Sequence, residues 1–139
     1  MISLSRALIY TTLMKTILLI AAGGAIGAVL RYAVVIGASQ WGGAGFPYGT
    51  IAVNIVGSLL LGVLAEVMSV LWHPSEEIRV FLIVGVLGAF TTFSSFSLDT
   101  VSLIQRNEIG LAALYVAGTV IFSVLGFLAG VAICRQLLT

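Results

Sequence analysis

Five hydroxyl side chains cluster with two glycines in a stretch that is otherwise hydrocarbon-like. The segment from Gly85 to Asp99 reads GVLGAFTTFSSFSLD, and its hydroxyls belong to Thr91, Thr92, Ser94, Ser95 and Ser97. Polar groups and irregular backbone are tolerated at membrane depth only where protein or water covers them. The cluster therefore predicts a path for a polar solute and a break in the surrounding helix near Gly88.

Two phenylalanines lie within the same cluster and share one face of a helix. Phe93 and Phe96 are three residues apart, a spacing that places their rings one above the other. A phenylalanine pair in a membrane usually serves packing, but the edge of an aromatic ring carries positive potential that would attract an anion. Cation channels commonly use acidic rings instead, and the run from Thr91 to Ser97 contains no acid. Hydroxyls and ring edges together favour an anion as the solute.

One amide, that of Asn54, interrupts another apolar run between Val53 and Ile55. A buried amide without a partner costs on the order of a few kcal/mol in hydrocarbon, so this side chain needs a hydrogen-bond partner. The partner is either a group on a neighbouring helix or an anion that accepts from the amide nitrogen, which carries two hydrogens. The residues alone leave both alternatives open.

The composition places these groups in a membrane. Of the 139 residues, 60% are hydrophobic and only 8% are charged, and the mean hydropathy is +1.23. In a soluble domain about a quarter of the residues are charged. With about 20 apolar residues per span, the length allows four helices, so we predict a single all-α transmembrane domain over residues 1–139. A net charge of +1 without a basic cluster argues against nucleic acid as a partner.

Turn-forming and capping residues divide the apolar sequence into its spans. Pro74 ends the second span because proline cannot continue a helix. Ser75 is the expected cap of the third, followed by Glu76 and Glu77 where the helix dipole favours acids. We expect this third helix to be broken. The four spans are predicted over about residues 16–38, 49–71, 75–104 and 110–135.

Glycines recur at helical spacing in two of these spans, the first and the fourth. Small residues four apart let helices approach closely in lipid, where packing rather than water drives association. The pairs are Gly23 with Gly27 and Gly126 with Gly130, and Gly57 and Gly62 have the same character beside Asn54.

The number of basic residues differs little between the two ends of such a bundle. The end with both termini carries Arg6, Lys15, Arg79 and Arg135, and the other end carries Arg31 and Arg106. Positive charge in short loops sets orientation, and Arg6 falls in residues 1–13, a candidate N-terminal extension before Met14, so the bias is weak. A chain of this kind could insert either way round. Two oppositely oriented copies could then form a closed two-fold dimer.

Five further residues carry chemistry that the cluster does not explain. Arg31 lies inside the first span, where it either snorkels to the interface or attracts anions in a watery vestibule. Glu66 and Asp99 are expected near helix ends, and Cys134 is the only cysteine, which predicts a packing role. His73 is the only histidine and adjoins a proline, so the spans hold no histidine-based catalytic or metal cluster. We therefore predict that the protein is not an enzyme.

Three blocks of the sequence resemble the signature blocks of the CrcB/Fluc fluoride channels. They are GAIGAVLRY at residues 24–32, GTIAVNIVG at 49–57 and GVLGAFTTFSSFS at 85–97. The resemblance holds in order and spacing over three of the four spans. It implies an antiparallel dual-topology homodimer in a bacterial plasma membrane, with two fluoride pathways lined by both subunits and a structural sodium ion on the dimer axis.

The resemblance also implies roles for individual residues of the pathway. Asn54 would donate to fluoride, and Phe93 and Phe96 would present their ring edges to it. Tyr115 and Ser123 would contribute from the fourth span. The residues themselves, apart from the resemblance, add the hydroxyls of Thr92, Ser94 and Ser95 to the expected pore and make Arg31 the candidate for a vestibule.

A sodium site is implied at the break in the third span, where Gly88 and Thr91 would supply backbone carbonyls. An unwound helix frees carbonyls that would otherwise bond four residues along, and oxygen ligands without a carboxylate suit a monovalent cation. This sequence departs from the family blocks at three places. Ser95 replaces a frequent threonine, Asp99 replaces a frequent glutamate, and Phe90 follows Ala89 where smaller or aliphatic residues are common.

The function that follows is a fluoride-selective channel through which the ion leaves passively. An inside-negative potential favours anion exit by about 2.3 kcal/mol per 100 mV, and the chain has no P-loop motif for a nucleotide. The alternative is a small proton-coupled multidrug transporter, which is also four spans long. That chemistry needs a membrane-embedded carboxylate, and Glu66 is the candidate for it.

Overall fold

The computed structural model describes residues 2–42 and 45–138, and these residues form helices and short connections without strands. Four stretches are long and apolar enough to cross a membrane, which confirms the predicted all-α membrane fold. The third of them, Glu76–Gln105, is built from several consecutive helices. The elements are α1 (Ile2–Gly42), α2 (Tyr48–Val70), α3 (Glu76–Arg79), the π-helix η1 (Val80–Leu87), α4 (Gly88–Phe90), α5 (Phe93–Gln105) and α6 (Ile109–Leu138).

The first helix is longer than its predicted span. Helix α1 begins at Ile2, about four turns before the expected start, and its apolar, membrane-competent part covers Tyr10–Gln40. Residues 2–15 contain neither glycine nor proline, so nothing in the local sequence stops the helix. The interpretation of residues 1–13 as an extension stays a prediction.

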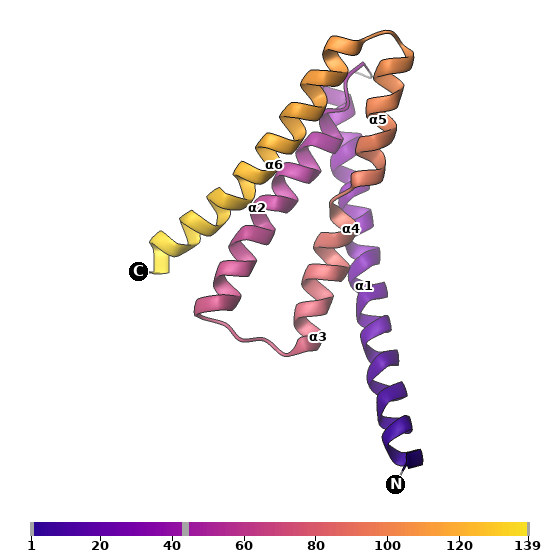
Figure 1. Ribbon diagram of the computed structural model, residues 1–139, viewed down its shortest axis with the longest axis vertical. Coiled ribbons are helices and arrows are strands. Elements are labelled where there is room, and N and C mark those ends of the chain that lie inside the picture. Colours follow the sequence, from indigo (N-terminus) through magenta and orange to yellow (C-terminus); the bar gives the residue numbers. More distant parts are fainter. Residues whose placement is uncertain (1, 43–44, 139) are drawn as a thin grey trace.

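The helices pack as two pairs, α1 with η1 and α2 with α6. In Figure 1 the two pairs lie close together near the α5–α6 turn and diverge toward the α2–α3 connection. Both chain ends point away from the α5–α6 turn. This is expected, because a chain that crosses a membrane four times has both of its ends on the same side.

Glycines permit the close approach within each pair. A methyl group on Gly27 would collide with the carbonyl oxygen of Val86, and one on Gly23 would lie 2.6 Å from that of Phe81. On the other pair, a methyl group on Gly130 would collide with the carbonyl oxygen of Leu59. The predicted packing role of these glycines is confirmed, because backbone meets backbone where their side chains would be.

The turn between α5 and α6 is closed by a left-handed asparagine. Asn107 has φ 60°, a conformation that asparagine tolerates better than most residues. Its amide donates to the carbonyl of Ile104 at 2.9 Å, and the amide of Glu108 donates to that of Leu103 at 3.0 Å. This pattern is a Schellman motif, and it returns α6 beside the bundle.

An ion pair joins the C-terminal part of α2 to the C-terminal part of α6. Arg135 Nε and a second guanidinium nitrogen donate to the two carboxylate oxygens of Glu66, at 2.9 and 3.2 Å. Glu66 is 8% exposed, so its charge needs this partner. Cys134 is buried next to Arg135 in the chain, at 6% exposure, and its predicted packing role is confirmed. Ser75 stands at the N-cap of α3 as predicted, although its side chain makes no capping hydrogen bond.

Candidate functional site

Two extended residues separate α4 from α5 inside the third apolar segment. Thr91 has φ −78° and ψ 161°, and Thr92 has φ −153° and ψ 122°. The side chain of Thr92 caps α5, because its hydroxyl accepts a hydrogen bond from the amide of Ser95 at 3.1 Å. The helix therefore ends at Phe90, where the amide of Thr91 makes the last helical bond, to the carbonyl of Leu87 at 3.0 Å, and a new helix begins at Phe93.

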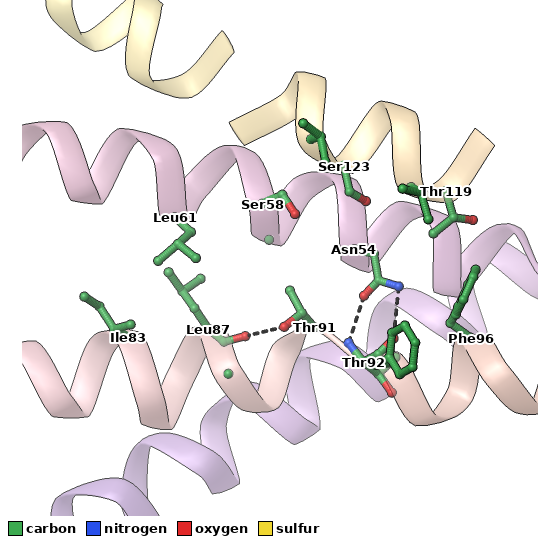
Figure 2. Close-up of a pocket in the computed structure, with 15 residues that line it drawn as sticks. Asn54, Ser58, Leu61, Ile83, Leu87, Thr91, Thr92, Phe96, Thr119 and Ser123 are labelled. Atoms are coloured by element: carbon green, nitrogen blue, oxygen red, sulfur yellow. Dashed lines mark hydrogen bonds between the residues drawn. The ribbon is translucent and has the colours of Figure 1, made fainter. Parts of the chain in front are cut away.

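The amide of Asn54 takes over the hydrogen bonds that the extended residues lose. Its Nδ2 donates to the carbonyl oxygen of Thr92 at 3.0 Å, and its Oδ1 accepts from the amide nitrogen of Thr92 at 2.8 Å. Figure 2 shows the two bonds side by side. Of the two alternatives that the sequence left open, the bond to a neighbouring helix is present. The second hydrogen on Nδ2 has no partner among the described residues and stays available to a ligand.

Several carbonyl oxygens at the end of α4 lose their helical donors, as at any helix end, and those of Gly88 and Thr91 are among them. In an unbroken helix the carbonyl of Gly88 would accept from the amide of Thr92, and that of Thr91 from the amide of Ser95. Here the Thr92 amide donates to Asn54 and the Ser95 amide donates to the hydroxyl of Thr92. The carbonyls freed by this exchange belong to the two residues expected to hold sodium.

The hydroxyls of the cluster divide into two groups. Thr92 Oγ1 lies 3.3 Å from Ser94 Oγ and 3.1 Å from Ser95 Oγ, so three hydroxyls form one network around the start of α5. Ser97 instead donates to the carbonyl of Phe93 within its own helix, at 3.0 Å. Thr91 likewise donates to a carbonyl four residues earlier, that of Leu87, at 3.0 Å, so the hydroxyls around Thr92 are the ones bonded mainly to one another.

A pocket of about 390 Å³ lies against this interruption, between α2, the third apolar segment and α6. Of the predicted site residues it brings together Asn54, Gly88, Thr91, Thr92, Phe93, Phe96 and Ser123. Figure 2 shows residues of all three segments around it. Its lining, as far as the structure describes the chain, contains no charged residue. Ser94, Ser95, Tyr115 and Arg31 are not part of the lining.

Two hydroxyls on α6 are buried along this pocket without a partner. Thr119 Oγ1 and Ser123 Oγ make no hydrogen bond within the described part of the chain. An unsatisfied buried hydroxyl costs free energy, so a ligand or water that bonds to it is favoured. Ser123 was predicted from the sequence, whereas Thr119 was not. The spacing of four residues from Tyr115 to Thr119 to Ser123 places all three on one face of α6, and this signal could have identified it.

The phenylalanines lie next to each other at the start of α5. Their ring centroids are 5.4 Å apart with planes 39° to each other. Phe96 is 9% exposed, whereas Phe93 is 78% exposed on this single chain. Phe96 thus packs into the chain, and Phe93 presents most of its ring outside it.

Tyr115 lies beside Phe96 but bonds away from the pocket. Its ring centroid is 5.3 Å from that of Phe96, and its hydroxyl donates to Asp99 Oδ2 at 3.1 Å. The same oxygen accepts from the hydroxyl of Thr50 at 2.7 Å. Asp99 and Thr50 also line a second pocket, of about 360 Å³, near the turn that carries Arg106. A pore role for Tyr115 stays a prediction, and so does a vestibule role for Arg31, which is half-buried on α1.

Comparison with known proteins identifies the family of the chain. Residues 18–131 match the family model described as CrcB-like protein, Camphor Resistance (CrcB). A protein of Rhodospirillum centenum named Fluoride-specific ion channel FluC is 52% identical over 122 residues, which cover 88% of this chain and 97% of that protein. A protein of the same name from Agrobacterium fabrum is 50% identical over 89% of this chain and 99% of its own length. The chain is a multi-pass bacterial membrane protein, and it belongs to the CrcB family.

Proposed function

We propose that the protein is a fluoride-selective channel through which the ion leaves the cell passively. The observation that carries the proposal is the interruption at Thr91 and Thr92, held by Asn54 and bordered by the unpartnered hydroxyls of Thr119 and Ser123. Similar proteins that span the same length are named fluoride-specific ion channels, not enzymes. No catalytic step is needed to account for the arrangement.

The chemistry of the lining suits a small, strongly hydrated anion. A selective path has to replace water by several donors and still release the ion. Hydroxyl groups and the free hydrogen of the Asn54 amide are neutral donors, and the edges of Phe93 and Phe96 add positive potential. None of these groups carries a fixed charge that would trap the ion.

A second copy of the chain, inserted in the opposite direction, completes each pathway. One copy supplies only part of the wall, because Phe93 lines the pocket and yet keeps 78% of its surface exposed. An antiparallel homodimer would cover this ring and form two equivalent pathways by its two-fold symmetry. The third span of each copy is then interrupted within the membrane, where protein covers the freed backbone.

The freed carbonyls of Gly88 and Thr91 fit a structural sodium ion. Two carbonyls from each copy would place four oxygen ligands around a two-fold axis, and carbonyl oxygens without a carboxylate suit a monovalent cation. The ion would neutralise carbonyl dipoles that the interruption leaves without donors. Gly88 and Thr91 both border the pocket, so a cation there would also favour an anion nearby.

Passive anion efflux from proteoliposomes tests the proposal. Vesicles loaded with potassium fluoride and treated with a potassium ionophore are expected to release fluoride rapidly, whereas vesicles loaded with chloride are expected to retain it. When sodium is also present on both sides of the membrane, replacing it by a large organic cation is expected to slow fluoride release. Equal release of the two halides, or no release of either, would contradict the channel assignment.

Removing the two unpartnered hydroxyls is expected to slow fluoride release without unfolding the protein. In Thr119→Val with Ser123→Ala, release falls at least about tenfold if the barrier rises by about 1.4 kcal/mol. The thermal unfolding temperature stays equal or rises, because a buried hydroxyl without a partner is destabilising. Thr16→Val on α1 is a matched control, since its hydroxyl is already bonded to the carbonyl of Thr12. A parallel loss of folding and release in the double variant would show a structural role instead.

The transporter alternative depends on Glu66, and the ion pair with Arg135 weakens it. A carboxylate that exchanges protons has to be free to lose its partner. Glu66 instead accepts hydrogen bonds from two guanidinium nitrogens of Arg135, and it is 8% exposed. Glu66→Gln is expected to leave fluoride release within about twofold of the wild type, a barrier change below about 0.5 kcal/mol. Proton-driven uptake of a lipophilic cation that Glu66→Gln abolishes would favour the transporter.

A further inference from the structure

Gly57 lies on α2 directly against the first extended residue of the interruption. A Cβ on Gly57 would collide with Cγ2 of Thr91 and would lie 3.1 Å from Cδ1 of Phe90. Gly57 is buried, and it follows Asn54 by three residues, so both lie on the same face of α2. One turn of α2 thus contacts both extended residues, Thr91 through Gly57 and Thr92 through Asn54.

The side chain of Thr91 is held at both of its branches. Its hydroxyl donates to the carbonyl oxygen of Leu87 at 3.0 Å, and its methyl occupies the space that a side chain at Gly57 would fill. Threonine is branched at Cβ and therefore stiff about χ1. Holding both branches fixes the χ1 rotamer of Thr91 and ties this extended residue to α2 on one side and to the carbonyl of Leu87 on the other.

We propose that Gly57 is a positioning residue that sets the direction of the Thr91 carbonyl. Without a side chain at position 57, the Thr91 methyl docks on α2 while its hydroxyl stays bonded to Leu87. A methyl group at position 57 forces either rotation of χ1, which breaks the bond to Leu87, or displacement of the Thr91 backbone. Displacement of the backbone turns the Thr91 carbonyl directly, whereas rotation of χ1 releases the side-chain bond to Leu87 that helps to hold Thr91 in its extended conformation. This inference rests on the proposed function, in which that carbonyl binds sodium.

The role differs from that of the glycines that join α2 to α6. A methyl group on Gly62 would collide with the carbonyl oxygen of Phe127, which is backbone of a neighbouring helix and cannot be shortened by substitution. The atom that Gly57 accommodates is instead the tip of a side chain. A substitution at Thr91 can therefore remove the collision, and this makes the contact testable by compensation.

The test is a pair of compensating substitutions, Gly57→Ala and Thr91→Ser, made singly and together. Serine keeps the hydroxyl and removes the methyl, so the double variant loses the collision with Thr91. The approach to Cδ1 of Phe90, at 3.1 Å, remains and requires only a small movement of that ring. We expect Gly57→Ala to slow fluoride release at least about tenfold and to require more sodium for half of its maximal rate. Thr91→Ser alone is expected to slow release by a smaller factor, and the double variant is expected to recover to the rate of Thr91→Ser.

Gly62→Ala is the matched control on the same helix. Thr91→Ser is not expected to improve Gly62→Ala, because the collision there is with Phe127 and not with Thr91. Thermal unfolding of all variants measures the same compensation without using fluoride. The two proposals can fail separately. If the wild-type protein releases no fluoride, but Thr91→Ser restores the unfolding temperature that Gly57→Ala lowers, the proposed function is wrong and the packing of Gly57 against Thr91 is supported.

Two results would overturn the inference. One is wild-type release and wild-type sodium dependence in Gly57→Ala, and the other is a double variant no better than Gly57→Ala in both release and unfolding. If Gly57→Ala alone does not fold, Thr91→Ser and Thr91→Val carry the test, since each releases one branch of the Thr91 side chain. Both are then expected to need more sodium for half-maximal release, and an unchanged requirement in both would overturn the inference.

Discussion

Asn54→Ala is expected to abolish most fluoride release and to lower the thermal unfolding temperature as well. The substitution removes the donor to the Thr92 carbonyl and the acceptor from the Thr92 amide. Thr92 is 7% exposed, and each backbone group left unsatisfied costs about 1–3 kcal/mol. The loss should therefore be seen both in release from proteoliposomes, at least about tenfold, and in a thermal melt of the purified protein.

Asn54→Asp separates these two effects. Aspartate keeps an acceptor for the Thr92 amide but places a second oxygen against the Thr92 carbonyl, where the amide nitrogen donated at 3.0 Å. It also adds a negative charge to a pocket whose described lining has none, and this charge repels an anion. We expect slower release than in Asn54→Ala. Ser69→Ala, far along α2 with its hydroxyl bonded to the Glu66 carbonyl, is the control, and wild-type release in Asn54→Ala would contradict a role in the pathway.

Phe93→Ile is expected to slow fluoride release strongly while leaving the fold intact. Isoleucine keeps an apolar side chain but has no ring edge with positive potential. Phe93 is 78% exposed on the single chain, so little packing within the chain is lost. Isoleucine keeps an apolar surface toward the second copy, and the unfolding temperature should fall less than in Phe96→Ile. Release should fall at least about tenfold, which corresponds to about 1.4 kcal/mol in the barrier. Flux assays measure the slower release, and thermal melts on the same preparation measure whether the fold is kept.

Two neighbours on α5 provide the comparison for Phe93→Ile. Leu98 is 67% exposed and lies outside the pocket lining, so Leu98→Ile is expected to match the wild type. Phe96 is 9% exposed and packs against Tyr115, so Phe96→Ile is expected to lower both release and stability. If Phe93→Ile and Leu98→Ile behaved alike, the ring of Phe93 would have no part in conduction.

Much of the fold was predictable because it follows from local properties of the chain. Hydropathy over about 20 residues identifies a span, and all four expected spans are present as membrane-competent segments. Glycines at a spacing of four identify close packing, and Gly27 and Gly130 do contact backbone of a neighbouring helix. The dense hydroxyls around Thr92 also marked the place where the pocket lies.

Other features could not be derived from a linear pattern. The π-helical stretch Val80–Leu87 and the helical start of α1 at Ile2 leave no distinctive signal in residue types. Thr119 shares a helix face with Tyr115 and Ser123, but its burial beside the pocket without a partner is visible only in the structure. The bond from the hydroxyl of Tyr115 to Asp99 likewise depends on the packing of α5 against α6, and a pore role for Tyr115 stays a prediction.

The sequence by itself determined that this is a four-span membrane protein with one polar, helix-breaking segment. Only the tertiary structure decided that Asn54 bonds to Thr92 and that Gly57 accommodates Thr91. Hydropathy and periodicity depend on residues within a few turns of each other, so they can be read along the chain. A hydrogen bond between residues 54 and 92 depends on which helices pack together and at what rotation, and side-chain packing between distant segments sets both.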